Sequence, residues 1–413
     1  MDAEAPSPRI NLASAFRWVA VWGPGLLVML ADTDAGNIVT AAQAGARWGY
    51  RLLPLVLALI PMLYMVQELT VRLGIATGRG YGELVRERFG RGWAWLATAG
   101  LAAAAVGSLV TEFTGVAGIG ELYGLSRNLS LPLAATALLA VVATGSYRRV
   151  ERTALVIGLC ELAFFAVAWV AHPSFKRLAQ DVTDLPFGNR EFRYLAAAVI
   201  GMVFNPWMVF YQQSATADKK LCAADYRAAR WDTAIGAVLT QCLSAAVLVA
   251  AAATLAARGA PARLISIGQI GNTLSPMLGN GAGRLVFSIG VLGASLVAAI
   301  VSSLALAWGL GEVAGYQRSL EYRPFETGWF YGVYALCVVG AAALVWSAPD
   351  LVWLNIAAQV VNTFLLPLII GLLVALAVEA LPEALRLSGW YLALVVGVSA
   401  AVALLALYGG ISA

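Results

Sequence analysis

The sequence predicts an all-α polytopic membrane protein, because its composition is far too apolar for a soluble chain. Of its 413 residues, 61% are hydrophobic and only 12% are charged, whereas average soluble chains have roughly 45–50% apolar and about 25% charged residues. The mean hydropathy is +0.79. Apolar stretches of about 20 residues, the length of a helix that crosses a bilayer, recur along the whole chain. These observations exclude a soluble enzyme.

Eleven apolar stretches, bounded by charges, glycines and prolines, are the expected transmembrane helices. They cover residues 18–46, 53–77, 94–124, 131–147, 153–171, 193–215, 232–257, 285–311, 328–346, 351–379 and 388–409. The connecting loops are short, so residues 18–379 form one transmembrane core and 388–409 an eleventh helix. Residues 1–17 are expected to be a flexible cytoplasmic tail rather than a cleaved signal.

Lys and Arg are distributed unevenly between the two sides of the membrane. Summed over alternate loops, 17 lie on the side of the N-terminus and 10 on the other side. Because cytoplasmic loops carry the excess of basic residues, the N-terminus is expected in the cytoplasm of a bacterial inner-membrane protein. The basic residues form no dense run, which excludes nucleic acid as a partner.

Polar residues interrupt the middle of the first span. Asp32 and Asp34 lie there with Gly36 and Asn37. An ionised carboxylate near the bilayer centre costs about 2.5–3.5 kcal/mol even on the insertion scale, and no Lys or Arg lies deep in any predicted span. A bound cation, another partner or protonation must offset this cost. The alternative is a kinked helix whose acids pair with Arg elsewhere.

The sixth span is interrupted by Asn205-Pro206. Proline lacks a backbone N–H and clashes with the carbonyl four residues earlier, so the carbonyls near Met202 and Val203 lose their helical partners. Freed carbonyls at membrane depth are tolerated where they line a cavity or coordinate an ion.

The two interrupted spans open two groups of five spans, residues 18–171 and 193–379. Since five is odd, the second group enters the membrane from the opposite side, which predicts an inverted 5+5 repeat with broken helices 1 and 6. Sodium-coupled amino-acid symporters use the same repeat. Interrupted helices at matching positions of inverted halves are the best sequence indication of a transporter's midplane site.

The polar residues of the two breaks predict a hard divalent cation. Asp34 and Asn37 are three residues apart and share a helix face, and Asn205 adds a third oxygen. Carboxylate, amide and carbonyl oxygens suit Mg²⁺, Ca²⁺ or Mn²⁺. Iron or manganese would be favoured if Met202 turned its sulfur toward the ion.

Three segments make the chain resemble the NRAMP divalent-metal transporters: DAGNIVTAAQAGARWGY from Asp34, QELTVRLGIATG from Gln67, and AQVVN from Ala358. The first span of that family carries Asp-Pro-Gly-Asn, followed by a similar Gln-Ala-Gly-x-x-x-Gly-Tyr. The resemblance implies an inverted five-plus-five repeat, an ion held between spans 1 and 6, and Asp34 and Asn37 as ligands. Gln359 would match the family's glutamine in span 10.

The chain departs from the family pattern at several positions. Ala35 replaces the proline of the first span, which would leave Gly36 as the main helix breaker. Asn205 stands where the family has its methionine ligand, and Trp207 and Gln212 replace two histidines tied to proton movement. Leu109 replaces an acid of the proton route in span 3. These losses resemble the NRAMP-related magnesium transporters, which carry Mg²⁺ and Mn²⁺ without proton coupling.

Several other intramembrane polar residues fit a pathway for a partly hydrated ion. Mg²⁺ keeps part of its water shell, so its site needs polar groups that hold waters, and Trp207 is expected to narrow the path. Glu112 is either a pathway residue or an acid bonded to a neighbouring helix, and Glu161 has no local partner. The residues expected to hold waters are Asp32, Asn205, Gln212, Gln359 and Asn362.

The sequence therefore predicts a secondary transporter that moves Mg²⁺, and also Mn²⁺, by alternating access. Its expected partners are the divalent ion and the lipid bilayer, without a cofactor, and the chain is expected to be a monomer. A proton-coupled Mn²⁺/Fe²⁺ importer that uses Met202, a sodium-coupled amino-acid symporter and a metal sensor are the alternatives. No enzyme motif is present.

Overall fold

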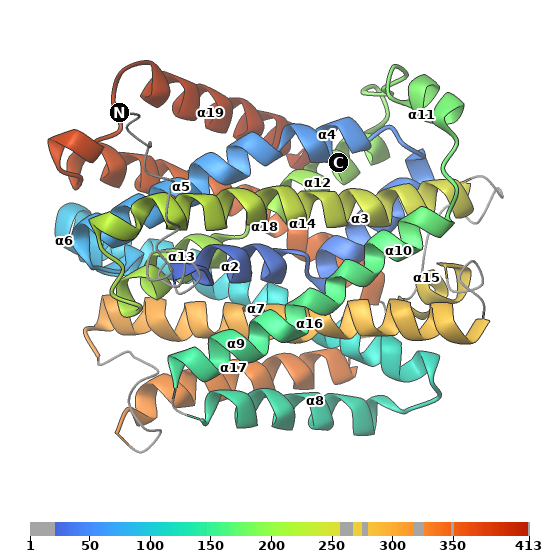
Figure 1. Cartoon of the computed structure of the whole chain (residues 1–413), viewed down its shortest axis with the longest axis horizontal. Helices are drawn as coiled ribbons and strands as arrows, with labels where there is room; N and C mark the ends of the chain where they lie inside the picture. The colour runs from blue at the N-terminus through green and yellow to red at the C-terminus, as the bar shows by residue number, and fades with distance from the viewer. Residues whose placement is uncertain are drawn as a thin grey trace, which may run out of the picture.

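The computed structural model describes residues 21–144, 146–256, 267–274, 280–316, 326–347 and 351–411. This part of the chain is a bundle of helices without strands, shown in Figure 1. Among the described residues, nine helices are long and apolar enough to cross a membrane. The two remaining predicted spans are the first, which is a broken helix, and the fourth, which is a shorter apolar helix. The expected tail, 1–17, lies outside the described residues.

The first half of the chain contains α2 (Pro24–Asp32), α3 (Ala35–Trp48), α4 (Leu53–Ala58), α5 (Ile60–Thr77), α6 (Tyr81–Phe89), α7 (Arg91–Leu122), α8 (Arg127–Val142), α9 (Tyr147–Gly158), the 3₁₀ turn η1 (Leu159–Leu162) and α10 (Ala163–Val170). The second half contains α11 (Phe175–Asp181), α12 (Arg190–Val203), α13 (Pro206–Asp218), η2 (Ala223–Asp225), α14 (Tyr226–Thr254), α15 (Ile267–Leu274), α16 (Asn280–Ala314), α17 (Gly328–Ser347), α18 (Leu351–Glu379), η5 (Glu383–Leu385) and α19 (Gly389–Ile411).

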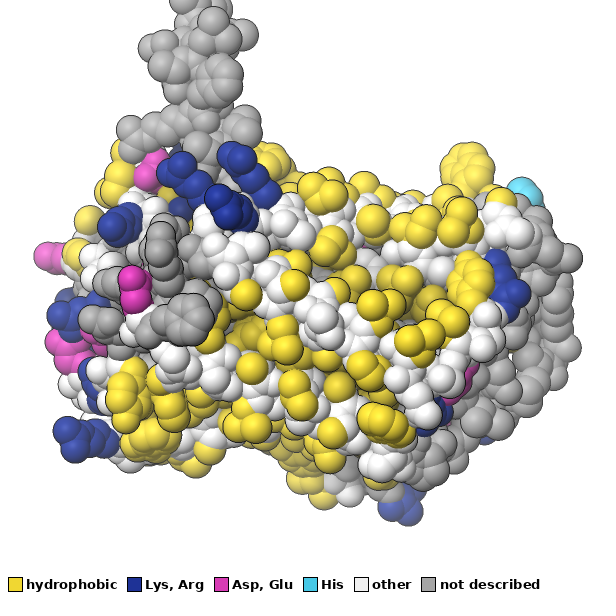
Figure 2. All heavy atoms as spheres, turned by 90° about the horizontal axis from the view of Figure 1, so that it is seen from below, with side chains coloured by type: hydrophobic (Ala, Val, Ile, Leu, Met, Phe, Trp, Pro, Cys, Tyr) yellow, Lys and Arg dark blue, Asp and Glu magenta, His cyan; other side chains and the backbone are white. Residues whose placement is uncertain are grey.

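The surface of the bundle is suited to a bilayer. Figure 2 shows apolar side chains over the middle of one face, with Lys and Arg side chains toward the two ends. Helices satisfy their own backbone hydrogen bonds, so they are the natural form for chain that lies in hydrocarbon. The chain is a multi-pass membrane protein.

The fourth and fifth spans differ from the prediction in their boundaries. Helix α8, which forms the fourth predicted span, ends at Val142. Tyr147, the predicted last residue of that span, begins α9 instead. Arg148, Arg149 and Arg152 therefore lie in the first turns of α9, not in a loop. Long basic side chains extend from a helix end toward the water, so hydropathy alone places this boundary too late.

Spans 1 and 6 cross the bundle in opposite directions, as the inverted repeat requires. Tyr50, after α3, donates its N–H to Asp181 of α11 at 3.0 Å, so the end of span 1 lies beside the start of span 6. Lys219, after α13, donates to the Trp22 carbonyl at 3.0 Å, so the end of span 6 lies beside the start of span 1. The broken helices are thus antiparallel.

The first half of span 1 is held in place by an acid of α14. Asp232 accepts hydrogen bonds from the backbone N–H groups of Gly23 at 3.2 Å, Gly25 at 2.8 Å and Leu26 at 3.1 Å. The first N–H groups of a helix have no partner within it, and a negative charge there also meets the positive end of the helix dipole. Asp232 therefore fixes the start of α2 against α14.

Replacing Asp232 by Ala should lower the free energy of unfolding by about 1–3 kcal/mol, because buried N–H groups lose their acceptor. The measurement is thermal unfolding of the purified protein in detergent. Asp184→Ala is the control: its carboxylate pairs with Arg51 at the surface, and exposed ion pairs contribute about 0–1 kcal/mol. Equal effects of the two substitutions would contradict the role given to Asp232.

Candidate functional site

The break in span 1 lies at Thr33 and Asp34. The backbone of Asp34 is extended, with φ −70° and ψ 172°, and its side chain caps α3. One carboxylate oxygen, Oδ1, accepts the N–H of Asn37 at 2.7 Å. Aspartate is among the preferred residues at this capping position, so Asp34 itself begins the second half of the span.

Gly36 is not the helix breaker that the sequence predicted. It lies inside α3, and a Cβ at this position would collide with the Nε2 of Gln359 and lie 3.1 Å from Oδ1 of Asp34. The sequence has a glycine here because the amide of span 10 approaches the backbone of span 1 closely.

The break in span 6 lies at Phe204 and Asn205. Helix α12 ends at Val203, and Pro206 is the first residue of α13. Proline is favoured at a first helical position because the missing N–H has no helical partner there and its φ is already set. The same proline thus ends one half-helix and starts the next.

Side-chain amides join the two breaks. The Nδ2 of Asn37 donates to the carbonyl of Met202 at 3.0 Å and also to the carbonyl of Asp32. The Nδ2 of Asn205 donates to Oδ1 of Asp32 at 3.2 Å and to the carbonyl of Met202 at 3.3 Å. The freed carbonyl of Met202 is therefore shared by both spans.

Two residues of α18 complete this network. Gln359 donates to Oδ1 of Asn37 at 3.3 Å, and Asn362 donates to Oε1 of Gln359 at 3.0 Å and to Oδ1 of Asn205. The structure thus brings together all six residues predicted to bind the ion, namely Asp32, Asp34, Asn37, Met202, Asn205 and Gln359. Asn362, a predicted pathway residue, lies with them.

Two atoms of this cluster have no hydrogen-bond partner among the described residues: Oδ2 of Asp32 and Oδ2 of Asp34. Both side chains are fully buried, and no ion pair within the described chain involves either acid. The described residues contain no group of three or more His, Cys, Asp or Glu side chains placed to hold one metal ion together. Two open carboxylate oxygens among amides and carbonyls form a donor set for a hard cation.

The other predicted pathway residues have different partners. Glu112 accepts the N–H of Ala35 at 3.1 Å, so it bonds to the first residue of α3. Gln212 bonds instead to Thr233 at 2.7 Å and Thr70 at 3.2 Å, which ties α13 to α14 and α5. Trp207 is fully buried beside Pro206.

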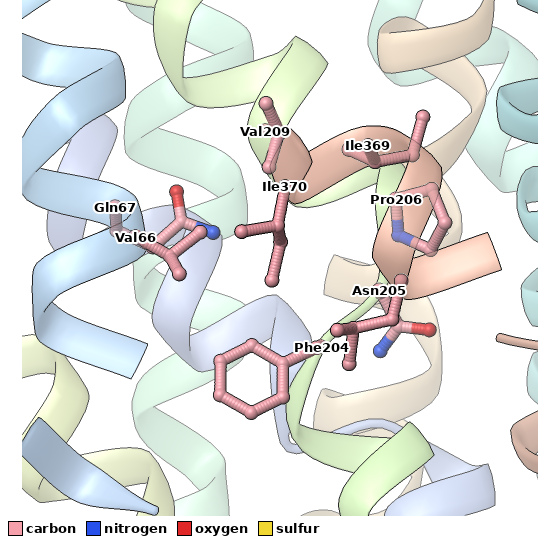
Figure 3. Close-up of a pocket in the computed structure, with 9 residues that line it drawn as sticks. Val66, Gln67, Phe204, Asn205, Pro206, Val209, Ile369 and Ile370 are labelled. Atoms are coloured by element: carbon pink, nitrogen blue, oxygen red, sulfur yellow. The ribbon is translucent and has the colours of Figure 1, made fainter. Parts of the chain in front are cut away.

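A residue that sequence reasoning missed lies beside Asn205. Gln67 of α5 lines a cavity of about 10 Å³ together with Phe204, Asn205 and Pro206, and Figure 3 shows these side chains around it. Its Oε1 is buried without a hydrogen-bond partner among the described residues. Such a cavity has the size of about one water molecule. The only signal in the sequence is a glutamine within an apolar run. Such a signal does not show that the glutamine lies beside Asn205 of another span.

Residues 25–412 match the model of the Nramp family, described as natural resistance-associated macrophage protein-like. The chain belongs to the Nramp family. Relatives named divalent metal cation transporter MntH include that of Yersinia enterocolitica, 30% identical over 301 residues, or 70% of this chain and 71% of the relative. The MntH of Klebsiella pneumoniae is 29% identical over 300 residues, 70% of each chain.

Solved structures share the fold of this Nramp chain. The Eremococcus coleocola manganese transporter, in complex with an aromatic bis-isothiourea substituted compound, has a TM-score of 0.78 at 17% identity, covering 98% of this chain and 88% of that one. MhsT in complex with L-phenylalanine has a TM-score of 0.64 at 14% identity, covering 94% and 98%. The all-helical inverted-repeat fold predicted from the sequence is thereby confirmed.

Replacing Gly36 by Ala should weaken Mn²⁺ binding by tenfold or more, because the new methyl group displaces the Gln359 amide from Asn37. The measurement is calorimetric titration of the purified protein. Gly107→Ala is the matched control: its Cβ would lie 3.6 Å from the Cβ of Ala358 on the same α18, an ordinary contact. Undiminished binding by Gly36→Ala would contradict the packing described here.

Proposed function

We propose that this protein is a secondary transporter that carries a hard divalent cation, Mg²⁺ and also Mn²⁺, across the bacterial inner membrane. The membrane potential drives the ion inward, without coupling to protons. The observation that carries the proposal is the pair of open carboxylate oxygens of Asp32 and Asp34, buried between two broken helices and without a basic partner among the described residues.

The donor set favours a hard ion over a thiophilic one. The position facing Asp32 from span 6 is an amide, Asn205, and Met202 contributes a backbone carbonyl to the network. Amide and carbonyl oxygens suit Mg²⁺ and Mn²⁺, whereas sulfur selects softer metals. The cavity beside Gln67 and Asn205 supports the same ion, since Mg²⁺ usually keeps several waters of its shell.

A polar cavity supports a route from the site toward one end of the bundle. Its volume is about 190 Å³, and it is lined by Gly78, Gly80, Ser214, Ala217, Asp218, Trp308 and Glu312. Helix α13 leads from the span-6 break to this cavity, where it ends at Asp218. Tyr211 of α13 packs on Trp308 of α16 with ring centroids 5.4 Å apart. We infer that separating α13 from α16 opens the site to this end of the bundle. The excess of Lys and Arg in the loops at this end predicts that it faces the cytoplasm.

The energetics do not require a second driving ion. Moving two positive charges inward is favoured by about 4.6 kcal/mol per 100 mV of membrane potential. Histidine is the usual side chain for proton movement near neutral pH, and the only one in the sequence is His172, which lies between α10 and α11.

The second candidate is a proton-coupled Mn²⁺ importer. A relative named divalent metal cation transporter MntH and a structural neighbour called a manganese transporter support Mn²⁺ as the ion of this candidate. Glu112, bonded to the first residue of α3, is the acid placed to move a proton beside the ion. The two candidates differ in one measurable property, the movement of protons with the metal.

The test is Mg²⁺ flux into liposomes that contain the purified protein, with a negative-inside potential and internal pH followed in parallel. We expect Mg²⁺ entry without acidification and inhibition of that entry by external Mn²⁺. Asp34→Asn should reduce the flux at least tenfold because one open carboxylate is lost. Asp184→Asn, an exposed acid outside the site, should transport normally.

Two results would contradict the proposal. If Mg²⁺ stays outside while Mn²⁺ enters with acidification of the lumen, the proton-coupled importer is correct. If Asp34→Asn still transports Mg²⁺ at the wild-type rate, the ion does not pass through the break in span 1.

A further inference from the structure

Glu161 in the fifth span is a buried acid that the divalent-ion site does not use. It lies on η1, the 3₁₀ turn that interrupts this span between α9 and α10. Its side chain is fully buried, and neither carboxylate oxygen has a hydrogen-bond partner among the described residues. An acid at membrane depth without a partner marks a functional position.

The last residues of α9, directly before the turn that carries Glu161, pack tightly against the first span and the eighth. A Cβ at Gly158 would lie 3.1 Å from Cδ1 of Leu30 in α2, and a Cβ at Gly293 of α16 would lie 2.7 Å from the carbonyl oxygen of Ile157. These glycines let three helices meet at η1. This packing fixes the position of the turn that carries Glu161.

Glu161 faces the break in span 1. Its carboxylate lies beside the Thr33 side chain and within electrostatic range of Asp34, Glu112 and Asp32. The Thr33 hydroxyl pairs with the hydroxyl of Thr240 at 2.7 Å, which leaves its remaining lone pair available to a ligand. Polar groups of spans 6 and 10 thus lie on one side of the break, and the Glu161 carboxylate of span 5 lies on another.

The buried acids around the break, when ionised, carry more negative charge than one divalent ion offsets. Four buried acids surround the break, namely Asp32, Asp34, Glu112 and Glu161, and none takes part in an ion pair within the described residues. One divalent ion offsets two negative charges. The C-terminal end of α2 adds the negative end of a helix dipole to the same place.

We propose that Glu161 binds a second cation, a monovalent alkali-metal ion, between η1 and the C-terminal end of α2, with the Thr33 hydroxyl as a neutral ligand. One carboxylate with neutral oxygens gives a site of charge −1, which matches a monovalent ion, and oxygen donors suit a hard one. The assignment of the divalent ion to Asp34 rests on the proposed function, but binding at Glu161 is measurable without transport.

The experiment is thermal unfolding of the purified full-length protein in NaCl, KCl or choline chloride at equal ionic strength. A site saturated about tenfold above its Kd should raise the unfolding temperature by about 1–3 °C in Na⁺ or K⁺ relative to choline. Glu161→Gln should remove this difference. Asp34→Asn should keep it while losing Mn²⁺ binding, which separates this site from the divalent-ion site.

Glu151→Gln is the matched control on the same span, since Glu151 pairs with Lys219 at 2.9 Å and lies outside the proposed site. It should lower stability but keep the alkali-ion response. If Glu161→Gln does not fold, the wild-type comparison of Na⁺, K⁺ and choline still decides. Equal unfolding temperatures of the wild type in all three salts, or an unchanged response in Glu161→Gln, would overturn the proposal.

Discussion

The burial of Asp32 and Asp34, for which the described residues supply no basic partner, is the constraint on which the rest of this structure depends. Two open carboxylate oxygens at membrane depth cost several kcal/mol if ionised. The chain surrounds them with the amides of Asn37, Asn205 and Gln359, which hold the geometry but supply no charge. In the function proposed above, the transported ion supplies the missing positive charge, so the energetic cost of the empty site favours binding.

The two helix breaks explain how this arrangement is built from local sequence. Asp34 caps the second half of span 1, and Pro206 begins the second half of span 6. Each break exposes backbone groups that a continuous helix would satisfy internally, and side chains supply their partners. The carbonyl of Met202 receives the Asn37 amide in this way. The breaks therefore stabilise each other, and neither would be tolerated alone in hydrocarbon.

The breaks and the inverted repeat could be predicted from the sequence because each has a local signal, and the residues predicted to bind the ion do lie together. Acids, amides and a proline within apolar runs can be recognised from the sequence alone. The reasoning failed where a role depends on a distant helix. Gly36 was interpreted as a helix breaker, but its contact with Gln359 lies 323 positions away in the sequence. The sequence also did not predict that Asp232 accepts hydrogen bonds from the start of α2, or that Gln67 lies beside Asn205. Both contacts join residues that are far apart in the sequence.

The measurement that tests the central claim most directly is the position of Mn²⁺ in crystals of this protein, found by anomalous scattering. We expect one strong peak within about 2.5 Å of a carboxylate oxygen of Asp34, between the breaks of spans 1 and 6. Asp34→Asn crystals should lack this peak. A strong peak elsewhere, with none between the two breaks, would contradict the account.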